Sequence, residues 1–171
     1  MNNQIQKLYN IALKAERLII GLMSGTSMDG LDIALCKMKK SGKATEIEVL
    51  KFKTVDYTGD FRHKIKAIFS KKDADLELVC LMNEEIGLMH AALINQTLKS
   101  WGIANAEIDL IASHGQTIFH APKSLHKLKD YPNGTLQIGD GDHIAVQTGI
   151  ITISDFRQKH IAAGGEGAPL A

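Results

Sequence analysis

The sequence predicts an α/β fold built on a mixed β-sheet flanked by helices. Three observations support this. Apolar runs and alternating apolar residues between residues 18 and 57 are typical of consecutive strands. Two segments with helical spacing follow, and after them strand-like runs alternate with short helical or loop segments. The 171 residues, of which 44% are hydrophobic and 23% charged, are enough for one sizeable core.

The first strands are predicted to form an antiparallel meander. The continuous apolar run 18–23 is typical of a strand buried on both faces. Residues 31–36 alternate between large apolar residues and polar or small ones, which is the period of a strand. The Asp29-Gly30 pair lies where a tight turn would join these two strands. After a Ser-Gly turn, residues 47–57 resume the composition of a strand.

Three helices are predicted in the first two thirds of the chain. Residues 2–15 and 59–72 each carry apolar residues at near-helical spacing. Residues 73–101 keep apolar side chains three and four positions apart, which predicts a long helix packed on the core. Either Asp73 or Asp75 could be the N-cap of this long helix.

The last third alternates strands with short helices or loops. Residues 108–113 and 134–139 predict strands, and residues 140–149 predict a short helix. Residues 150–154 predict a strand that carries Asp-Phe-Arg at its carboxyl end. The Gly-rich stretch 162–169 predicts a loop with no closing helix or strand, so we expect a fragment of a longer protein.

Charge and cysteine usage narrow the class of partner. The formal net charge of +1 gives no electrostatic footprint for nucleic acid or for an anionic membrane surface, which favours a small-molecule or protein partner.

Cys36 and Cys80 lie in apolar segments without the spacing of a redox or metal motif, so both are predicted to be core thiols. The cytoplasm suits such a chain best. Its first residues show neither a signal peptide nor a membrane span.

Residues 24–30 place small and polar side chains between two predicted strands. Backbone amides and hydroxyls are suitable donors for phosphate oxygens, and the glycines would let a phosphate approach closely. Asp29 and Asp32 would repel a naked phosphate but suit a metal-bound one. The spacing is not that of a Walker A loop. A plain hairpin turn is the alternative, although it would need only Asp29 and Gly30. The hydroxyls belong to Ser24, Thr26 and Ser27.

A second polar group, Ser-His-Gly-Gln-Thr at 113–117, directly follows a predicted strand. Ligand contacts gather at the carboxyl ends of strands in open α/β sheets, and hydroxyl, imidazole and amide groups suit sugar hydroxyls. His114 could equally be an ordinary loop histidine with local partners. A zinc site with His120 is not favoured, because a third ligand is not evident.

Asp155 and Arg157 follow a β-branched run and should lie near the same sheet edge. The carboxylate can accept from a ligand hydroxyl, and the guanidinium can bind an anionic group. A salt bridge between them is the alternative. A hydrolase triad of Ser24 or Ser27 with His114 and Asp155 is not favoured, because the Gly-x-Ser-x-Gly elbow is absent.

Four ordered segments produce a resemblance to a known family. They read IGLMSGTSMDGLDIAL, SHGQTIFH, LQIGDG and DFRQKHIAAGGEGAPL, between residues 20 and 170. The chain resembles the anhydro-N-acetylmuramic acid kinases of the actin, hexokinase and Hsp70 ATPase superfamily. The resemblance implies that residues 1–171 are an N-terminal ribonuclease H-like domain, the truncated half of a two-domain ATPase fold whose C-terminal domain is absent.

The resemblance also implies an activity and its site. Such a kinase uses ATP and Mg²⁺ to phosphorylate O6 of an amino sugar, 1,6-anhydro-N-acetylmuramic acid, while water opens the anhydro bridge at C1. The product is N-acetylmuramic acid 6-phosphate, in murein (peptidoglycan) recycling. The implied ATP phosphate loop comprises Gly25, Thr26, Ser27, Met28, Asp29, Gly30, Leu31 and Asp32. The implied sugar contacts are Ser113, His114, Gln116, Thr117, Asp155 and Arg157.

The sequence departs from the family pattern at several positions. Asp140-Gly141 replaces the family's Asn-Pro, and His160 replaces a common aspartate. The family's general base lies in a later Asp-x-Gly-Pro segment that is not within these residues, so no catalytic residue is assigned and the chain alone is expected to be inactive. Family members commonly form homodimers. A non-catalytic nucleotide-binding module of the Hsp70 or actin type is the alternative.

Overall fold

A six-stranded mixed sheet with helices on its faces forms the protein, as the sequence predicts. The structure, a computed structural model, describes residues 3–167. The strands are β1 (Glu16–Ser24), β2 (Gly30–Lys39), β3 (Glu46–Asp56), β4 (Leu110–Ala121), β5 (Gly134–Ile138) and β6 (Thr152–Ile153). The helices are α1 (Asn3–Leu13), α2 (Gly59–Ile68), α3 (Leu76–Trp101), α4 (Lys123–His126), α5 (Gly141–Thr148) and α6 (Phe156–Ala162), with short 3₁₀ turns η1 (Gly42–Ala44) and η2 (Asn105–Glu107).

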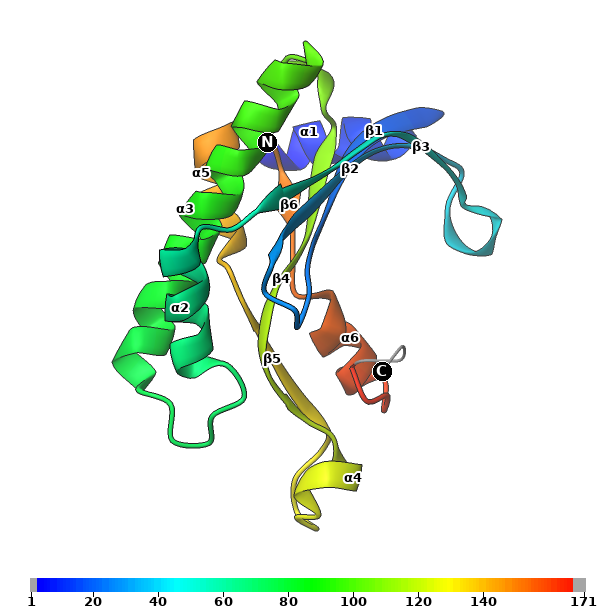
Figure 1. Cartoon of the computed structure of the whole chain (residues 1–171). Coiled ribbons are helices and arrows are strands. Elements are labelled where there is room, and N and C mark those ends of the chain that lie inside the picture. The colour runs from blue at the N-terminus through cyan, green and yellow to red at the C-terminus, as the bar shows by residue number, and fades with distance from the viewer. Residues whose placement is uncertain (1–2, 168–171) are drawn as a thin grey trace.

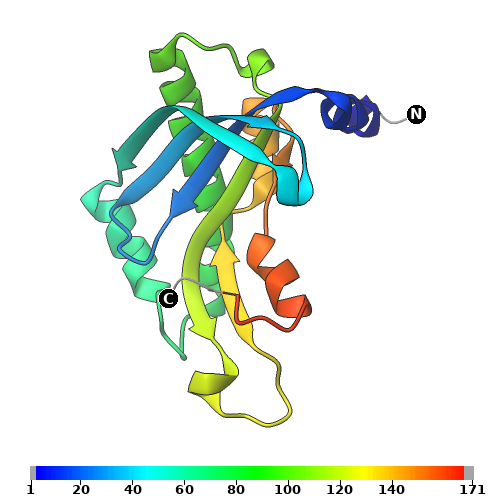
Figure 2. The same ribbon diagram turned by 90° about the vertical axis from the view of Figure 1, so that its right-hand side faces the viewer.

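The sheet order is β3-β2-β1-β4-β5, and β6 also pairs with β4. β1, β2 and β3 form the predicted antiparallel meander, and β4 lies parallel to β1. The first half of β4 pairs in parallel with β6, whereas its second half pairs antiparallel with β5. Figure 2 shows β4 as a long central strand with β5 beside its lower half. The arrangement confirms the predicted α/β fold with a mixed sheet, and β5 extends the second half of β4 as an antiparallel pair.

The core lies between the sheet and the helices on one side of it. Figure 1 shows α2 and α3 on that side and α6 on the other. The alternation in β2 is confirmed, because Leu31, Ile33 and Leu35 are buried while the residues between them are half-buried. Asp75 caps α3 by accepting from the amides of Glu77 and Leu78, as one of the two predicted N-caps. Burial of the apolar face of α3 against the sheet, rather than helix propensity, supplies most of the stabilisation of this helix.

Strand β1 is less buried than its apolar run predicts. Ile20 and Leu22 face the core, but Met23 is exposed on the other side of the sheet. That side is covered only in part by α6, so the expectation of burial on both faces is wrong for this chain. The prediction of two core thiols is wrong as well, because Cys36 is half-buried and Cys80 is exposed on α3.

The turn after β1 lies earlier than predicted. It spans Gly25 to Met28, with the Met28 amide donating to the Gly25 carbonyl at 3.3 Å and Met28 at φ 55°. Gly30 is needed for another reason, since a Cβ there would lie 2.5 Å from the Val55 carbonyl oxygen of β3. Gly30 therefore begins β2, with Asp29 directly before it, and this pair does not form the turn.

Two further segments differ from the prediction. β4 continues through residues 113–117, so these residues lie inside a strand and not after its end. Residues 156–162 form α6, where a strand end and loop were expected. The tail of the predicted loop, residues 168 and 169, lies outside the described residues.

Candidate functional site

The turn between β1 and β2 presents a small polar surface. Thr26, Ser27 and Asp29 are exposed, and Gly25 is half-buried. The Ser27 hydroxyl donates to Asp29 Oδ1 at 2.6 Å, and this hydrogen bond is the main reason why the pKa of Asp29 is lowered. Asp29 is therefore ionised at neutral pH.

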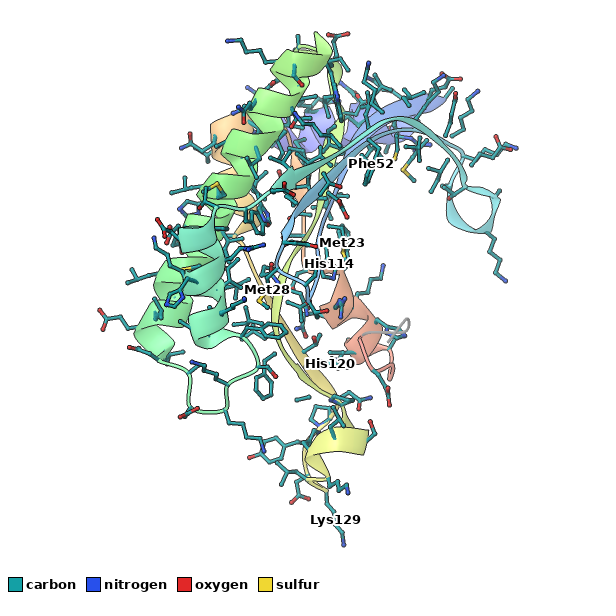
Figure 3. The ribbon with its side chains drawn as sticks, in the orientation of Figure 1. Met23, Met28, Phe52, His114, His120 and Lys129 are labelled. Carbon is teal, nitrogen blue, oxygen red and sulfur yellow. The ribbon has the colours of Figure 1, made fainter. Side chains whose placement is uncertain are left out.

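The remaining residues of the expected phosphate loop face inward or lie apart from its tip. Met28, Gly30 and Leu31 are buried, and Leu31 belongs to the core, so its side chain cannot contact a ligand. Figure 3 shows Met28 towards α2 and α3, whereas Met23 and His114 lie towards α6. Ser24 is fully buried, and its hydroxyl donates to Gln116 Oε1 at 2.6 Å. Its expected role as a phosphate donor is therefore not supported.

Asp32 lies on β2 and faces the same side of the sheet as Met23. Its Oδ1 accepts from the Thr54 hydroxyl at 2.5 Å. An open apolar hollow of about 400 Å³ adjoins it, bordered also by Met23, Phe52 and His114. One oxygen of the Asp32 carboxylate has no partner among the described residues, so it remains available to a metal-bound water.

Three of the expected sugar contacts are buried inside the protein. Ser113 and Gln116 are fully buried, and Thr117 is nearly so. The Ser113 hydroxyl accepts from the Gly115 amide, and Thr117 Oγ1 accepts from the Gln137 amide. The left-handed Gly115 (φ 71°) marks the point where β4 changes partner from β1 to β5. These three side chains shape the strand, and the structure does not bring them to an open surface.

His114 and Arg157 are brought together, although they are 43 residues apart. Arg157 Nε donates to His114 Nε2 at 2.7 Å, and His114 Nδ1 lies 2.9 Å from the Gly115 carbonyl oxygen. Since a guanidinium can only donate, Nε2 must be the acceptor and Nδ1 carries the proton. Burial, together with the nearby guanidinium, lowers the pKa of His114, so the ring is neutral at neutral pH. The other nitrogens of Arg157 have no hydrogen-bond partner within residues 3–167, so they remain available for an anionic group.

A polar hollow of about 270 Å³ adjoins this pair. His114 and Asp155 both line it, with Asp155 held at φ 66° just before α6. Within residues 3–167 Asp155 makes no ion pair, so the alternative of an Asp155–Arg157 salt bridge is not supported. Five polar residues of the hollow were missed by sequence reasoning: Asn83, Gln137, Asp140, Ser154 and Gln158. Of these residues, the sequence singled out only Asp140, as a departure from the Asn-Pro pair of the family.

A candidate metal cluster borders the hollow. His143 Nδ1 lies 2.6 Å from Asp140 Oδ2 and 2.8 Å from Glu84 Oε2. The Asp140 carboxylate raises the pKa of His143, and the imidazole lowers the pKa of Asp140 in return. The three groups therefore hold one another as an ion-pair network that also caps α5.

The less favoured chemistries find no support in the described part of the chain. His114 and His120 share no group of three metal-ligating side chains there. Ser24 and Ser27 have Gln116 and Asp29 as acceptors, so neither contacts His114 as a hydrolase triad requires. Among the described helices, none combines the length and the apolar character needed to cross a membrane.

A larger hollow does not coincide with these groups. It measures about 670 Å³, lies between α1 and α5, and is lined mainly by apolar residues. None of the predicted site residues lines it. The smaller polar hollow, which His114 lines and which Arg157 adjoins through its bond to that ring, is therefore the better candidate site.

Comparison with known proteins agrees with the sequence motifs. The family model for anhydro-N-acetylmuramic acid kinase matches residues 17–171. Proteins of that name from Pseudoalteromonas translucida and Pseudoalteromonas atlantica are 63% and 57% identical over the whole chain, and one from Caldanaerobacter subterraneus is 42% identical over 98% of it. The chain spans only 42% to 43% of the length of these relatives. Since the match extends over nearly all of its residues, the chain belongs to the anhydro-N-acetylmuramic acid kinase family.

Proposed function

We propose that this chain supplies the ATP phosphate loop and part of the sugar site of a kinase that converts 1,6-anhydro-N-acetylmuramic acid to N-acetylmuramic acid 6-phosphate. The observation that carries the proposal is the exposed turn at residues 25–29, which β4 connects to the polar hollow beside His114 and Arg157. Gln116 makes the connection, because its amide donates to the Gly25 carbonyl at 3.0 Å.

The turn fits a phosphate group. Among the described residues, the backbone amides of Thr26 and Ser27 have no backbone acceptor, and both residues are exposed. A Cβ built on Gly25 would find no atom closer than 3.8 Å, so open space lies against the backbone there. Free amides beside open space are the features by which a turn binds an anion. The exposed hydroxyl of Thr26 adds a further donor.

Asp29 and Asp32 are the residues we assign to Mg²⁺. Their carboxylates would act on the metal directly or through water, as hard oxygen ligands do. In phosphoryl transfer Mg²⁺ neutralises the β- and γ-phosphates. The lowered pKa of Asp29 keeps that carboxylate charged for this purpose.

The sugar is assigned to the polar hollow. Asp155 would accept a hydrogen bond from a sugar hydroxyl, and the free nitrogens of Arg157 would bind the carboxylate of the muramic acid. The neutral His114 orients the guanidinium through its fixed acceptor nitrogen. We assign the base that activates water to a segment beyond residue 171, so these residues bind and orient but do not complete the reaction.

We further propose that residues 1–171 are the N-terminal domain of the whole kinase. The whole protein would act in the cytoplasm, where it would return cell-wall amino sugar to metabolism, and would form a homodimer. The length of the relatives supports the presence of a second domain in the whole protein.

The substitution Gly25→Ala in the full-length protein tests the phosphate loop. The added methyl group meets only an ordinary contact in the chain, so folding should not change, but it would block a phosphate from approaching the backbone. We expect ATP binding, measured by calorimetry, to weaken by about tenfold or more, which is about 1.4 kcal/mol. Gly21→Ala on β1, which also has room, is the matched control and should bind ATP normally. Equal ATP affinity in both variants would remove the phosphate role of the turn.

A further inference from the structure

A buried chain of side-chain hydrogen bonds connects helix α3 to the turn at residues 25–29. His90 Nε2 lies 2.8 Å from the Tyr57 hydroxyl, which lies 2.9 Å from Ser24 Oγ. Ser24 donates to Gln116 Oε1, and the Gln116 amide donates to the Gly25 carbonyl. These residues come from α3, the end of β3, β1 and β4. Segments distant in the sequence therefore converge on this turn.

All the side chains in this series of hydrogen bonds are shielded from water. His90, Ser24 and Gln116 have no exposed surface, and Tyr57 is 6% exposed. A buried polar group that loses its partner costs free energy. Each side chain in this series of hydrogen bonds is therefore held in place by the next one. Burial also keeps His90 neutral by lowering its pKa to about 4, and it raises the pKa of Tyr57 to about 12.

The hydrogen bonds can run in one consistent direction. His90 Nδ1 has no partner among the described residues, so a proton there would be a buried, unsatisfied donor. The proton therefore belongs on Nε2 and is donated to the Tyr57 oxygen. Tyr57 then donates to Ser24, whose single proton goes to Gln116. Each hydroxyl donates once, which fixes the orientation of the amide that holds Gly25.

The same residues hold the other end of the turn. The Tyr57 backbone amide donates to the Asp29 carbonyl at 2.9 Å, on the side of the turn opposite the Gly25 carbonyl that Gln116 holds. The carbonyls on both flanks of the turn are thus anchored, while Thr26 and Ser27 between them stay exposed. Such an arrangement fixes where the free amides at the tip are directed.

We propose that His90 and Tyr57 are positioning residues for the phosphate loop, acting through Ser24 and Gln116 to hold the turn in the conformation that receives the phosphates of ATP. The proposal rests on the proposed function in one respect, the identity of the ligand. The positioning of the turn is a separate claim and has its own readout.

Tyr57→Phe in the full-length protein is the direct test. It removes the bridging hydroxyl but keeps the ring that packs edge-on against Phe61 at a centroid distance of 5.0 Å. We expect amide hydrogen exchange within residues 24–30 without nucleotide to rise about tenfold at the hydrogen-bonded amides, such as that of Met28, because both buried hydrogen bonds of the hydroxyl are lost. The KM for ATP should rise by a similar factor, with the KM for the sugar unchanged.

Two variants of His90 separate positioning from mere folding. His90→Gln retains an N–H group that can reach the Tyr57 oxygen, whereas His90→Leu retains none. We expect His90→Gln to preserve most of the exchange protection of the turn and His90→Leu to lose it. Thr97→Val is the matched control, since Thr97 is also buried on α3, and it should change neither the exchange of residues 24–30 nor the KM for ATP.

The outcomes distinguish the two claims. Unchanged exchange of residues 24–30 in Tyr57→Phe would overturn the positioning role, whatever the ATP data show. Faster exchange with an unchanged KM for ATP would overturn the link between the network and nucleotide binding. Faster exchange in a protein whose wild type does not bind ATP would support the positioning of the turn and refute the proposed function.

Discussion

The substitution Gly30→Ala tests why the chain has glycine where β2 begins. A Cβ at this position would lie 2.5 Å from the Val55 carbonyl oxygen, 3.1 Å from its carbonyl carbon and 3.2 Å from the Asp56 Cα. The shortest contact is about 0.9 Å below the 3.4 Å at which ordinary van der Waals contact begins. All three atoms are backbone, so β3 itself must move and the Gly30–Asp56 pairing must loosen.

Overpacking of this kind costs about 1–3 kcal/mol, and a clash with backbone places the cost near the upper end. We therefore expect the free energy of unfolding to fall by about 3 kcal/mol, measured by equilibrium urea denaturation. Gly21→Ala on the neighbouring strand has no atom within 4 Å of the added methyl group and should change the free energy by less than about 0.5 kcal/mol. A Gly30→Ala protein as stable as the Gly21→Ala protein would refute the close-approach argument.

Two further predictions concern buried and exposed titratable groups. The pKa of His90 is about 4 in the folded protein and 6.5 in the unfolded chain, so the unfolded state binds more protons between these pH values. The free energy of unfolding should therefore fall by about 3 kcal/mol from pH 7 to pH 4. Urea titrations of His90→Gln should lack this pH-dependent loss. An identical pH slope in both proteins would contradict it. Cys80 is exposed, whereas Cys36 is half-buried and its pKa is raised by burial. A thiol reagent such as DTNB should therefore modify Cys80 before Cys36. Equal rates of modification at the two cysteines would contradict this order.

The sequence predicted the features that depend on local periodicity. The alternation after Gly30 places Leu31, Ile33 and Leu35 in the core, and an aspartate before the long apolar stretch correctly marked the start of α3. Such patterns survive folding because one buried face is needed wherever the element lies. The turn that we propose binds phosphate was noticeable in the sequence, because its small and polar residues interrupt an apolar run.

Long-range side-chain contacts could not be predicted in the same way. His114 and Arg157 meet only because β6 pairs with β4 and α6 begins immediately after it. Inside the protein Ser24 forms hydrogen bonds with both Tyr57 and Gln116, and local periodicity cannot connect these three residues. Hydroxyl and amide groups look the same in a sequence whether they face a ligand or a neighbouring strand, and this is why buried structural residues were expected to bind sugar.

The proposed kinase activity is best tested by the release of ADP by the full-length protein, measured with and without 1,6-anhydro-N-acetylmuramic acid. We expect ADP formation that requires the sugar, together with a product whose mass corresponds to the sugar plus water and a phosphoryl group. ATP consumption that is independent of the sugar would contradict this kinase function. Nucleotide binding with no turnover would contradict it as well and would favour a non-catalytic nucleotide-binding module.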